Sequence, residues 1–108
     1  MSQSIPRLNA QGVTIYSKSA CKFCVLAKEF FDRHKIGYTI VYLNREENNE
    51  EYDQIVDALL SQSSQQSFPF IFIGESFLGG YTELENAYNT LRLHEMLASV
   101  GITLLMDF

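Results

Sequence analysis

The sequence predicts an α/β fold in which a four-stranded mixed sheet is flanked by helices on both faces. Short runs of β-branched and aromatic residues alternate with stretches whose apolar residues recur every three or four positions, in the order β-α-β-α-β-β-α-α. The opening β-α-β unit implies two parallel strands joined by a right-handed crossover. A later Gly-Glu-Ser turn between two short apolar runs implies an antiparallel hairpin, and the sheet is therefore mixed.

The first three elements are a strand, a helix and a second strand. Val13–Tyr16 is short and rich in β-branched and aromatic residues, as expected of a buried strand. Gly37 ends the helix that follows, and Tyr38–Leu43 forms the next strand. The helix is predicted from a single apolar face, which is made of Phe23, Leu26, Ala27, Phe30, Phe31 and His34.

The middle of the chain carries a polar connection, a helix and a polar loop. The connection is Asn44–Asn49, and the loop is Ser61–Ser67, which is too short for a domain linker. Phe70–Ile73 is the third strand, and Phe77 with Leu78 forms the fourth. The helix between connection and loop is predicted from an amphipathic stripe, which is made of Tyr52, Ile55, Val56, Leu59 and Leu60.

Two short helices follow the hairpin. Gly79 and Gly80 break the chain, and Thr82 with acidic residues behind it is a suitable helix start. A bend between the two helices is expected near Asn89–Leu91. Their apolar stripes are Leu84, Ala87, Tyr88 and Leu91 in the first helix, and Leu93, Met96, Leu97 and Val100 in the second.

The composition favours one domain spanning residues 1–108, with its core at about 13–100. The chain is 46% hydrophobic, and its apolar tail, residues 101–108, is expected to pack on the same domain. No apolar run approaches the ~20 residues that span a bilayer. The first residues also lack the apolar core of a signal peptide. We therefore expect a soluble, cytoplasmic monomer.

The formal net charge of −5 argues against two classes of partner. Nucleic acids and anionic membranes both need a basic surface on the protein that binds them. A small thiol substrate responds to local charge instead, so the net charge leaves that class of ligand open.

Cys21 and Cys24 are the only cysteines, and they form a Cys-Lys-Phe-Cys motif at the start of the first helix. A C-x-x-C pair beside a β-α-β pattern is typical of a redox centre. The helix N-terminus stabilises a thiolate, and Lys18 and Lys22 add positive charge. Cys21 is therefore the expected nucleophile. Cys24, one turn into the helix, is expected to be less exposed and suited to resolve a mixed disulfide.

Other interpretations of the cysteine pair fit the sequence less well. A structural zinc site needs four ligands, but the chain has no second cysteine pair, and His34 and His94 are isolated on or near apolar helix faces. Two packed core cysteines would not explain a position at the start of a helix. A permanent structural disulfide is not expected in a reducing compartment.

Two further motifs surround the expected cysteine site. Phe68-Pro69 directly precedes a strand, and position alone leaves both isomers of this bond open. A cis bond would direct the backbone of Phe68 outward, where it could bind a peptide-like ligand in the manner of a strand. Gly79 and Gly80 precede a helix start, and such glycines are expected to leave N–H groups open to an anion.

Together the three motifs resemble those of the glutaredoxin family, over roughly Val13 to Val100. The stretch I-Y-S-K-S-A-C-K-F-C is similar to the family's stretch with C-P-Y-C. Q-Q-S-F-P-F-I-F-I is similar to its T-V-P segment, whose proline is cis, and G-G-Y-T-E-L is similar to its G-G-x-[ST]-D-L. The three occur in the family's order and spacing.

The resemblance implies a thioredoxin fold and an enzyme, a glutathione-dependent thiol-disulfide oxidoreductase active in electron transport. By the resemblance, Cys21 attacks a glutathione mixed disulfide, the protein thiol leaves, and a second glutathione regenerates Cys21. For protein disulfides, Cys24 closes a disulfide with Cys21 and releases the reduced substrate. Glutathione is the implied reductant, and no metal is expected. Glutathionylated or disulfide-containing proteins are the implied partners, with ribonucleotide reductase among them.

The resemblance also implies a glutathione site. Lys18 faces the glycine carboxylate, Phe68 pairs its backbone with the cysteinyl part, and Pro69 fixes that geometry. The full set of implied glutathione-binding residues is Lys18, Phe23, Gln66, Phe68, Pro69, Gly80, Tyr81, Thr82 and Glu83. Four residues differ from the family pattern: Lys22 replaces proline, Phe23 replaces tyrosine, Gln66 replaces arginine and Glu83 replaces aspartate.

Two alternative functions accompany the resemblance. Some glutaredoxins bridge a [2Fe–2S] cluster between two subunits with glutathione, usually where the proline after the first cysteine is absent, and Lys22 stands there in this chain. The other alternative is a thioredoxin-like electron donor that a flavin reductase reduces. The chain has no tryptophan and no W-C-G-P-C, which argues against an ordinary thioredoxin, and it lacks the C-G-F-S of monothiol members.

Overall fold

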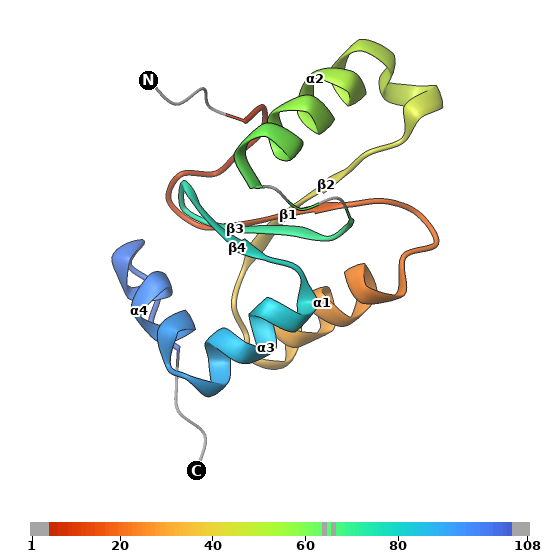
Figure 1. The fold of residues 1–108 in the computed structure, drawn as a ribbon. Coiled ribbons are helices and arrows are strands. Elements are labelled where there is room, and N and C mark those ends of the chain that lie inside the picture. Colours follow the sequence, from red (N-terminus) through yellow and green to blue (C-terminus); the bar gives the residue numbers. More distant parts are fainter. Residues whose placement is uncertain (1–4, 64, 66, 105–108) are drawn as a thin grey trace.

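A computed structural model of the protein describes residues 5–63, 65 and 67–104, without the side chains of residues 45–49. Its sheet has four strands in the order β2-β1-β3-β4 (Figure 1). β1 pairs with β2 in parallel and with β3 in antiparallel, and β3 pairs with β4 in antiparallel. The strands are β1 at Val13–Ser17, β2 at Tyr38–Tyr42, β3 at Phe70–Ile73 and β4 at Ser76–Gly79. The prediction of a four-stranded mixed sheet is confirmed.

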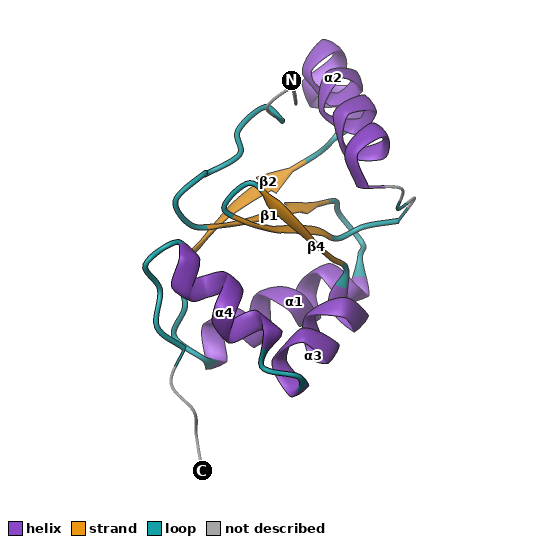
Figure 2. Ribbon diagram, turned by 60° about the vertical axis from the view of Figure 1, so that its left-hand side comes forward, coloured by secondary structure: helices purple, strands orange, loops and turns teal. Residues whose placement is uncertain are grey.

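Helices cover both faces of this sheet, as predicted. One face carries α2, and the other carries α1, α3 and α4 (Figures 1 and 2). The helices are α1 at Lys22–Arg33, α2 at Arg45–Ser63, α3 at Tyr81–Asn89 and α4 at Arg92–Ser99. The chain bends between α3 and α4 where Leu91 takes a positive φ of 66°, inside the range predicted for the bend.

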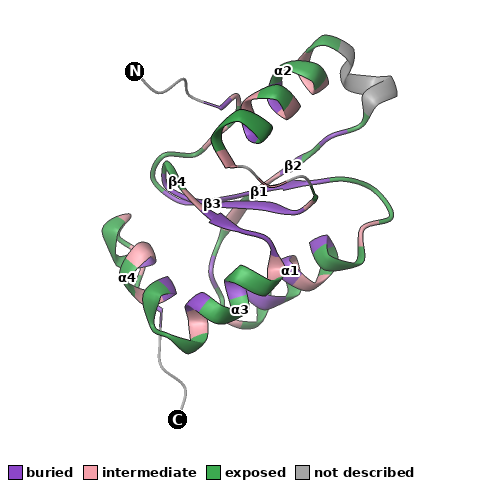
Figure 3. Ribbon diagram, viewed as in Figure 1, coloured by how far each residue is buried: buried purple, intermediate pink, exposed green. Residues whose placement is uncertain are grey.

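The two central strands are buried on both faces (Figure 3). In β1, Ile15 packs into the core under α1, α3 and α4, whereas the neighbouring Tyr16 packs into the core under α2. In β3, Ile71 and Phe72 divide in the same way. Because successive side chains of a strand point to opposite faces, a strand buried on both faces needs a continuous apolar run. This explains why neither strand shows an alternating polar pattern.

The predicted limits of α2 are wrong at both ends. The helix begins at Arg45, so it includes most of the stretch Asn44–Asn49 that was predicted to be a connection. It also continues to Ser63, into the predicted loop. Arginine and glutamate have high helix propensities but carry no apolar period, so an apolar pattern does not reveal helical turns made of them.

The apolar face of α1 is shifted from the prediction by one residue at its start. Cys24, Ala27, Phe30 and Phe31 are its buried residues, whereas the side chain of Phe23 is 53% exposed. Phe23 was predicted to belong to this face, because it has the right spacing from Ala27. It lies in the first turn of α1, directly after Lys22.

Both ends of the described chain contribute to the core beyond its expected limits of 13–100. Ile5 is buried on the α2 side of the sheet. Leu104 is buried on the opposite side, and Ile102 packs beside it. The prediction that the tail packs on its own domain is confirmed for these two tail residues, whereas residues 105–108 lie outside the described residues.

A partly buried hydrogen bond joins the N-terminal segment to the sheet. The hydroxyl of Tyr16, a residue with no exposed surface, donates to the carbonyl oxygen of Pro6 at 2.8 Å. Burial raises the pKa of Tyr16 far above its ordinary value. The phenol therefore stays neutral and remains a donor throughout the physiological pH range.

We expect Tyr16→Phe to lower the free energy of unfolding by about 1 kcal/mol, because the Pro6 carbonyl loses its buried donor. The matched control is Tyr38→Phe, since the Tyr38 hydroxyl donates to Asp32 at 3.0 Å at the exposed surface. Tyr38→Phe is expected to lower the free energy of unfolding by no more than about 0.5 kcal/mol. Urea unfolding followed by circular dichroism measures both. Equal losses in the two variants would contradict the role assigned to the Tyr16 hydrogen bond.

Candidate active site at the start of α1

Three segments far apart in the sequence leave the sheet at one end. β1 ends at Ser17, and the chain then leads to α1. Because β3 is antiparallel to β1, with Tyr16 opposite Phe70, the segment that enters β3 lies at the same end. β4 is antiparallel to β3, so its last residue, Gly79, also reaches this end. The three motifs singled out in the sequence therefore come together here.

Cys21 occupies the N-cap position of α1, as the sequence predicts. Its sulfur accepts a hydrogen bond from the backbone N–H of Cys24 at 3.3 Å. Its carbonyl oxygen accepts from the N–H of Val25 at 3.2 Å, which starts the helical ladder. The sulfur thus takes the place of a side-chain cap and satisfies one of the backbone N–H groups that a helix N-terminus leaves without a partner.

Cys24 is buried, with 1% of its surface exposed, whereas Cys21 is partly exposed, and both are free thiols. Burial is the main cause that raises the pKa of Cys24, and its hydrogen bond with Cys21 adds to the increase. Hydrogen bonds from the Ser17 side chain and the Lys18 backbone act in the opposite direction. The two thiols thus differ in access and in environment, in the sense predicted for a nucleophile and a resolving cysteine.

Ser17 was missed as a site residue. It is a buried polar residue at the end of β1, 1% exposed, its hydroxyl donates to the carbonyl oxygen of Lys18 at 3.4 Å, and its side chain acts to lower the pKa of Cys24. The only signal in the sequence is a serine that directly follows an apolar strand. That signal is weak, because serine is common wherever a strand ends in a turn.

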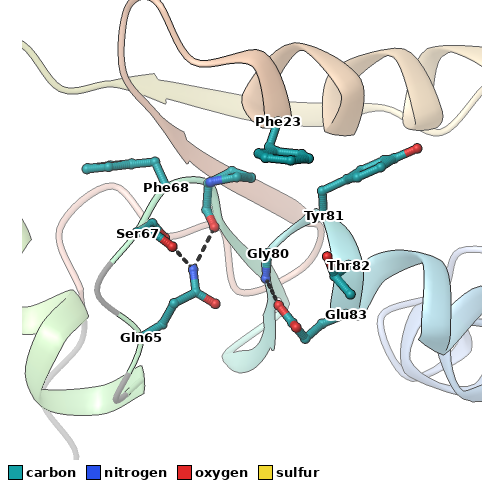
Figure 4. Close-up of a pocket in the computed structure, with 9 residues that line it drawn as sticks. Phe23, Gln65, Ser67, Phe68, Gly80, Tyr81, Thr82 and Glu83 are labelled. Atoms are coloured by element: carbon teal, nitrogen blue, oxygen red, sulfur yellow. Dashed lines mark hydrogen bonds between the residues drawn. The ribbon is translucent and has the colours of Figure 1, made fainter.

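A pocket of about 320 Å³ lies between the start of α1, residues 65 and 67–69, and the start of α3 (Figure 4). We name it the Phe68 pocket. Its lining residues are Phe23, Gln65, Ser67, Phe68, Pro69, Gly80, Tyr81, Thr82 and Glu83. Seven of the nine residues that the resemblance implied for glutathione binding are among them; the other two are Lys18 and Gln66.

Gln65 organises the chain beside this pocket, although no sequence pattern selected it as a site residue. Its side-chain amide donates to the carbonyl oxygens of Ser67 and Pro69, the latter at 2.9 Å (Figure 4). The Phe68–Pro69 peptide bond is cis, as the resemblance implied. Gln66, the neighbour that the resemblance selected, lies outside the described residues.

The two glycines before α3 allow a close turn. Gly79 has a φ of +133°, and a Cβ atom there would lie 2.6 Å from the side chain of Glu83, so no other residue fits without a shift. The N–H of Gly80 donates to the Glu83 carboxylate at 2.7 Å (Figure 4). The prediction that this N–H is open to an anion is therefore wrong for Gly80. The helix also begins at Tyr81, one residue before the predicted start at Thr82.

Phe23 and Tyr81 form an aromatic wall of the Phe68 pocket. Their ring centroids lie 6.2 Å apart, and the rings are stacked with an angle of 28° between their planes (Figure 4). This contact joins the helix that carries both cysteines to the start of α3. It explains why Phe23 is not part of the buried face of α1.

A second hollow, of about 470 Å³, lies beside the cysteines. We name it the lysine groove. Its lining residues are Ser17, Lys18, Ser19, Ala20, Cys21, Lys22, Cys24, Val25, Lys28 and Tyr42. The ammonium group of Lys18 also lies 5.7 Å from the ring centroid of Phe68. Lys18 therefore connects the groove to the Phe68 pocket, in agreement with the prediction that it adds positive charge near Cys21.

Comparison with known proteins identifies the family. The family model described as Glutaredoxin matches residues 13–78. The chain belongs to the glutaredoxin family. Human glutaredoxin-2, which is named as mitochondrial, is 32% identical over 83 residues, which are 77% of this chain and 45% of the human protein. Glutaredoxin-2 from Schizosaccharomyces pombe is 32% identical over 89 residues, which are 82% of this chain and 77% of the yeast protein.

Solved glutaredoxin structures share the fold. The buckwheat glutaredoxin–glutathione complex matches with a TM-score of 0.74 and 27% identity, over 85% of this chain and 81% of the other. Oxidized glutaredoxin 2 from Chlamydomonas reinhardtii matches with a TM-score of 0.68 and 36% identity, over 83% and 82%. The implied thioredoxin fold is confirmed. The chain spans about half the length of the mammalian mitochondrial glutaredoxins that it matches.

Two further properties concern only the described part of the chain. Among those residues, no three histidine, cysteine, aspartate or glutamate side chains come together in a way that could hold a metal ion. Within the same residues, none of the helices combines the length and the apolar character needed to cross a membrane. What the arrangement of this glutaredoxin site provides chemically is an accessible sulfur at a helix start and a protected sulfur one turn away.

We expect Cys24 in a folded Cys21→Ser variant to react with iodoacetamide at neutral pH at least ~10-fold more slowly than in the urea-unfolded chain, because burial limits access to the sulfur and raises the pKa of the thiol, which leaves less thiolate. Adding Ser17→Ala should slow the reaction further, since a hydrogen bond that favours the thiolate is lost. Mass spectrometry of timed samples gives the rates. Equal rates in folded and unfolded protein would contradict the assigned environment.

Proposed function

We propose that the protein is a dithiol, glutathione-dependent thiol-disulfide oxidoreductase, and hence an enzyme. The observation that carries this proposal is the pair of thiols at the start of α1. Cys21 is accessible and receives a helix N–H, and Cys24 lies buried within hydrogen-bond contact of it. Membership of the glutaredoxin family supports the same activity.

Glutathione is proposed to bind in the Phe68 pocket, with its sulfur toward Cys21. The matching buckwheat structure is a glutathione complex, which supports a site of this kind. Lys18 would attract the glycine carboxylate, and the position of its ammonium group 5.7 Å from the centre of the Phe68 ring supports this role. The backbone of Phe68 would pair with the cysteinyl part, and Thr82 and Glu83 would receive the γ-glutamyl end. Gln66 stays a prediction for the carboxylate.

Glutamate in place of aspartate at residue 83 has a structural consequence for this site. One carboxylate oxygen of Glu83 accepts from the N–H of Gly80. We propose that its other oxygen accepts from the γ-glutamyl amine. The same side chain would then fix the turn before α3 and bind the ligand.

The reduction of a glutathione mixed disulfide is proposed to use Cys21 alone. Its thiolate attacks the glutathione sulfur, a bond forms between these two sulfurs, and the original disulfide breaks. The protein thiolate leaves and takes a proton from solvent. The thiolate of a second glutathione then attacks the glutathione sulfur bound to Cys21, releases oxidised glutathione and returns Cys21 to the thiolate.

Reduction of a protein disulfide is proposed to need both cysteines. Cys21 attacks one sulfur of the substrate and forms a mixed disulfide with it. Cys24 loses its proton and attacks the sulfur of Cys21, which releases the reduced protein and leaves a Cys21–Cys24 disulfide. Because burial raises the pKa of Cys24, this second step is expected to accelerate as the pH rises above neutral.

The test is turnover coupled to glutathione reductase, with thioredoxin reductase as the comparison reductant. Cys21→Ser is expected to abolish reduction of both substrate types, since the nucleophile is lost. Cys24→Ser is expected to retain reduction of glutathione mixed disulfides and to lose turnover of protein disulfides. A Cys21→Ser protein that still reduces a glutathionylated substrate would sink the proposal.

The remaining expectations stay predictions within this proposal. Cytoplasmic location, a monomeric state and ribonucleotide reductase as a partner each need their own measurement. Efficient reduction by thioredoxin reductase, without glutathione, would favour the thioredoxin-like alternative. A coloured dimer after anaerobic reconstitution with iron, sulfide and glutathione would favour the cluster-bridging alternative, in which Cys21 supplies a thiolate ligand.

A further inference from the structure

The lysine groove has a charge opposite to that of the chain as a whole. Three of its lining residues are lysines, and none of its lining residues is an aspartate or glutamate. The chain carries 13 acidic residues against 8 lysines and arginines. Positive charge is therefore concentrated beside Cys21 on a protein whose net charge is negative.

The groove extends away from the Phe68 pocket, and the two hollows share no lining residue. Beyond the cysteines, α1 contributes Lys28, one turn after Cys24. The ammonium group of Lys28 donates to the hydroxyl of Tyr42 on β2 at 2.6 Å and lies 5.2 Å from the centre of the Tyr42 ring. These contacts fix a positive charge at the far end of the groove, next to the edge strand of the sheet.

Apolar side chains border the same charges. Val25 is 48% exposed and Tyr42 is 49% exposed, and both line the groove. They are two of the five large hydrophobic residues that the described chain exposes. A surface with lysines spaced along exposed apolar groups fits an extended peptide segment that carries carboxylates and apolar side chains.

We propose that the lysine groove docks an acidic segment of the protein substrate, next to the cysteine that carries glutathione. The proposal rests on the proposed function. If the glutathione half of the mixed disulfide lies in the Phe68 pocket, the protein half has to leave in another direction, and the groove begins at Cys21 itself. Carboxylates that flank the substrate cysteine would lie near Lys22 and Lys28.

Lys28 is the residue that distinguishes this docking surface from the catalytic site. Lys18 is assigned to glutathione and Lys22 adjoins the nucleophile, whereas Lys28 lies seven positions after Cys21 and binds Tyr42. Reduction of a glutathione mixed disulfide does not use Cys24, so any effect of Lys28 on that thiol does not enter the measurement. The matched control is Arg92, an exposed cation on α4 that lines neither hollow.

The experiment compares two glutathionylated peptides that differ only in the residues on either side of the cysteine. These residues are aspartate and glutamate in the acidic peptide, and asparagine and glutamine in the neutral peptide. We expect the wild-type protein to reduce the acidic peptide with a kcat/KM about fivefold higher, and the preference to fall between about 50 mM and 500 mM NaCl. Lys28→Gln should lower kcat/KM for the acidic peptide about threefold and leave the neutral peptide unchanged. Arg92→Gln should change neither.

Several outcomes overturn the docking proposal. Equal rates on the two peptides would do so, as would equal effects of Lys28→Gln and Arg92→Gln. A change in the KM for glutathione with both peptides alike would show that the groove serves free glutathione instead. The mixed disulfide of glutathione and mercaptoethanol separates the two proposals. If the protein reduces this small mixed disulfide but does not discriminate between the peptides, only the docking proposal is wrong. If the protein reduces none of these substrates, the proposed function is wrong too.

Discussion

The antiparallel pairing of β1 with β3 is the constraint on which the site depends. Tyr16 lies opposite Phe70, so the chain leaves β1 toward Cys21 at the same end of the sheet at which it enters β3 from Pro69. β4 returns antiparallel to β3 and delivers Gly79 to this end as well. Three loops with no local relation in the sequence are thereby placed around one sulfur.

Burial of both faces of this strand pair makes the arrangement rigid. Each central strand contributes side chains to two separate cores, so α1 and α3 on one side and α2 on the other are needed to cover the apolar surface. α1 is held by Ala27, Phe30 and Phe31, which have little or no exposed surface. The first turn of α1 follows Cys21, and there the backbone N–H of Cys24 donates to the Cys21 sulfur.

The same packing gives the two thiols their different characters. Cys24 enters the interior with the buried face of α1, and the polar side chain of Ser17 beside it partly offsets the effect of burial on the pKa of the Cys24 thiol. Cys21, at the cap, remains partly exposed and lines the lysine groove. The proposed chemistry and the proposed substrate selection thus use opposite sides of one helix N-terminus, with Lys18 in contact with both.

The sequence by itself determined the α/β class, the strand order along the chain and the position of Cys21 at a helix start. These properties rest on local signals, since apolar period, glycine positions and motif spacing are all carried by neighbouring residues. The helical turns of α2 that begin at Arg45 gave no such signal, because polar helix formers lack a period. The motifs shared with glutaredoxins selected seven residues of the Phe68 pocket. A family motif can do this because it groups residues that come together only in the folded protein.

Only the tertiary structure decided which polar groups meet. Gln65 spans to Pro69, Ser17 reaches Cys24, and Glu83 takes the N–H of Gly80 that was expected to be open. Each contact depends on the geometry of a turn or on the packing of a helix against a strand. Neither of these can be predicted from the spacing of apolar residues along the chain. Lys18 and Lys22 lie beside Cys21 by their sequence position, but the contact of Lys28 with Tyr42 arises from the tertiary structure, because the pairing of β2 with β1 brings Tyr42 to the edge of the sheet beside α1.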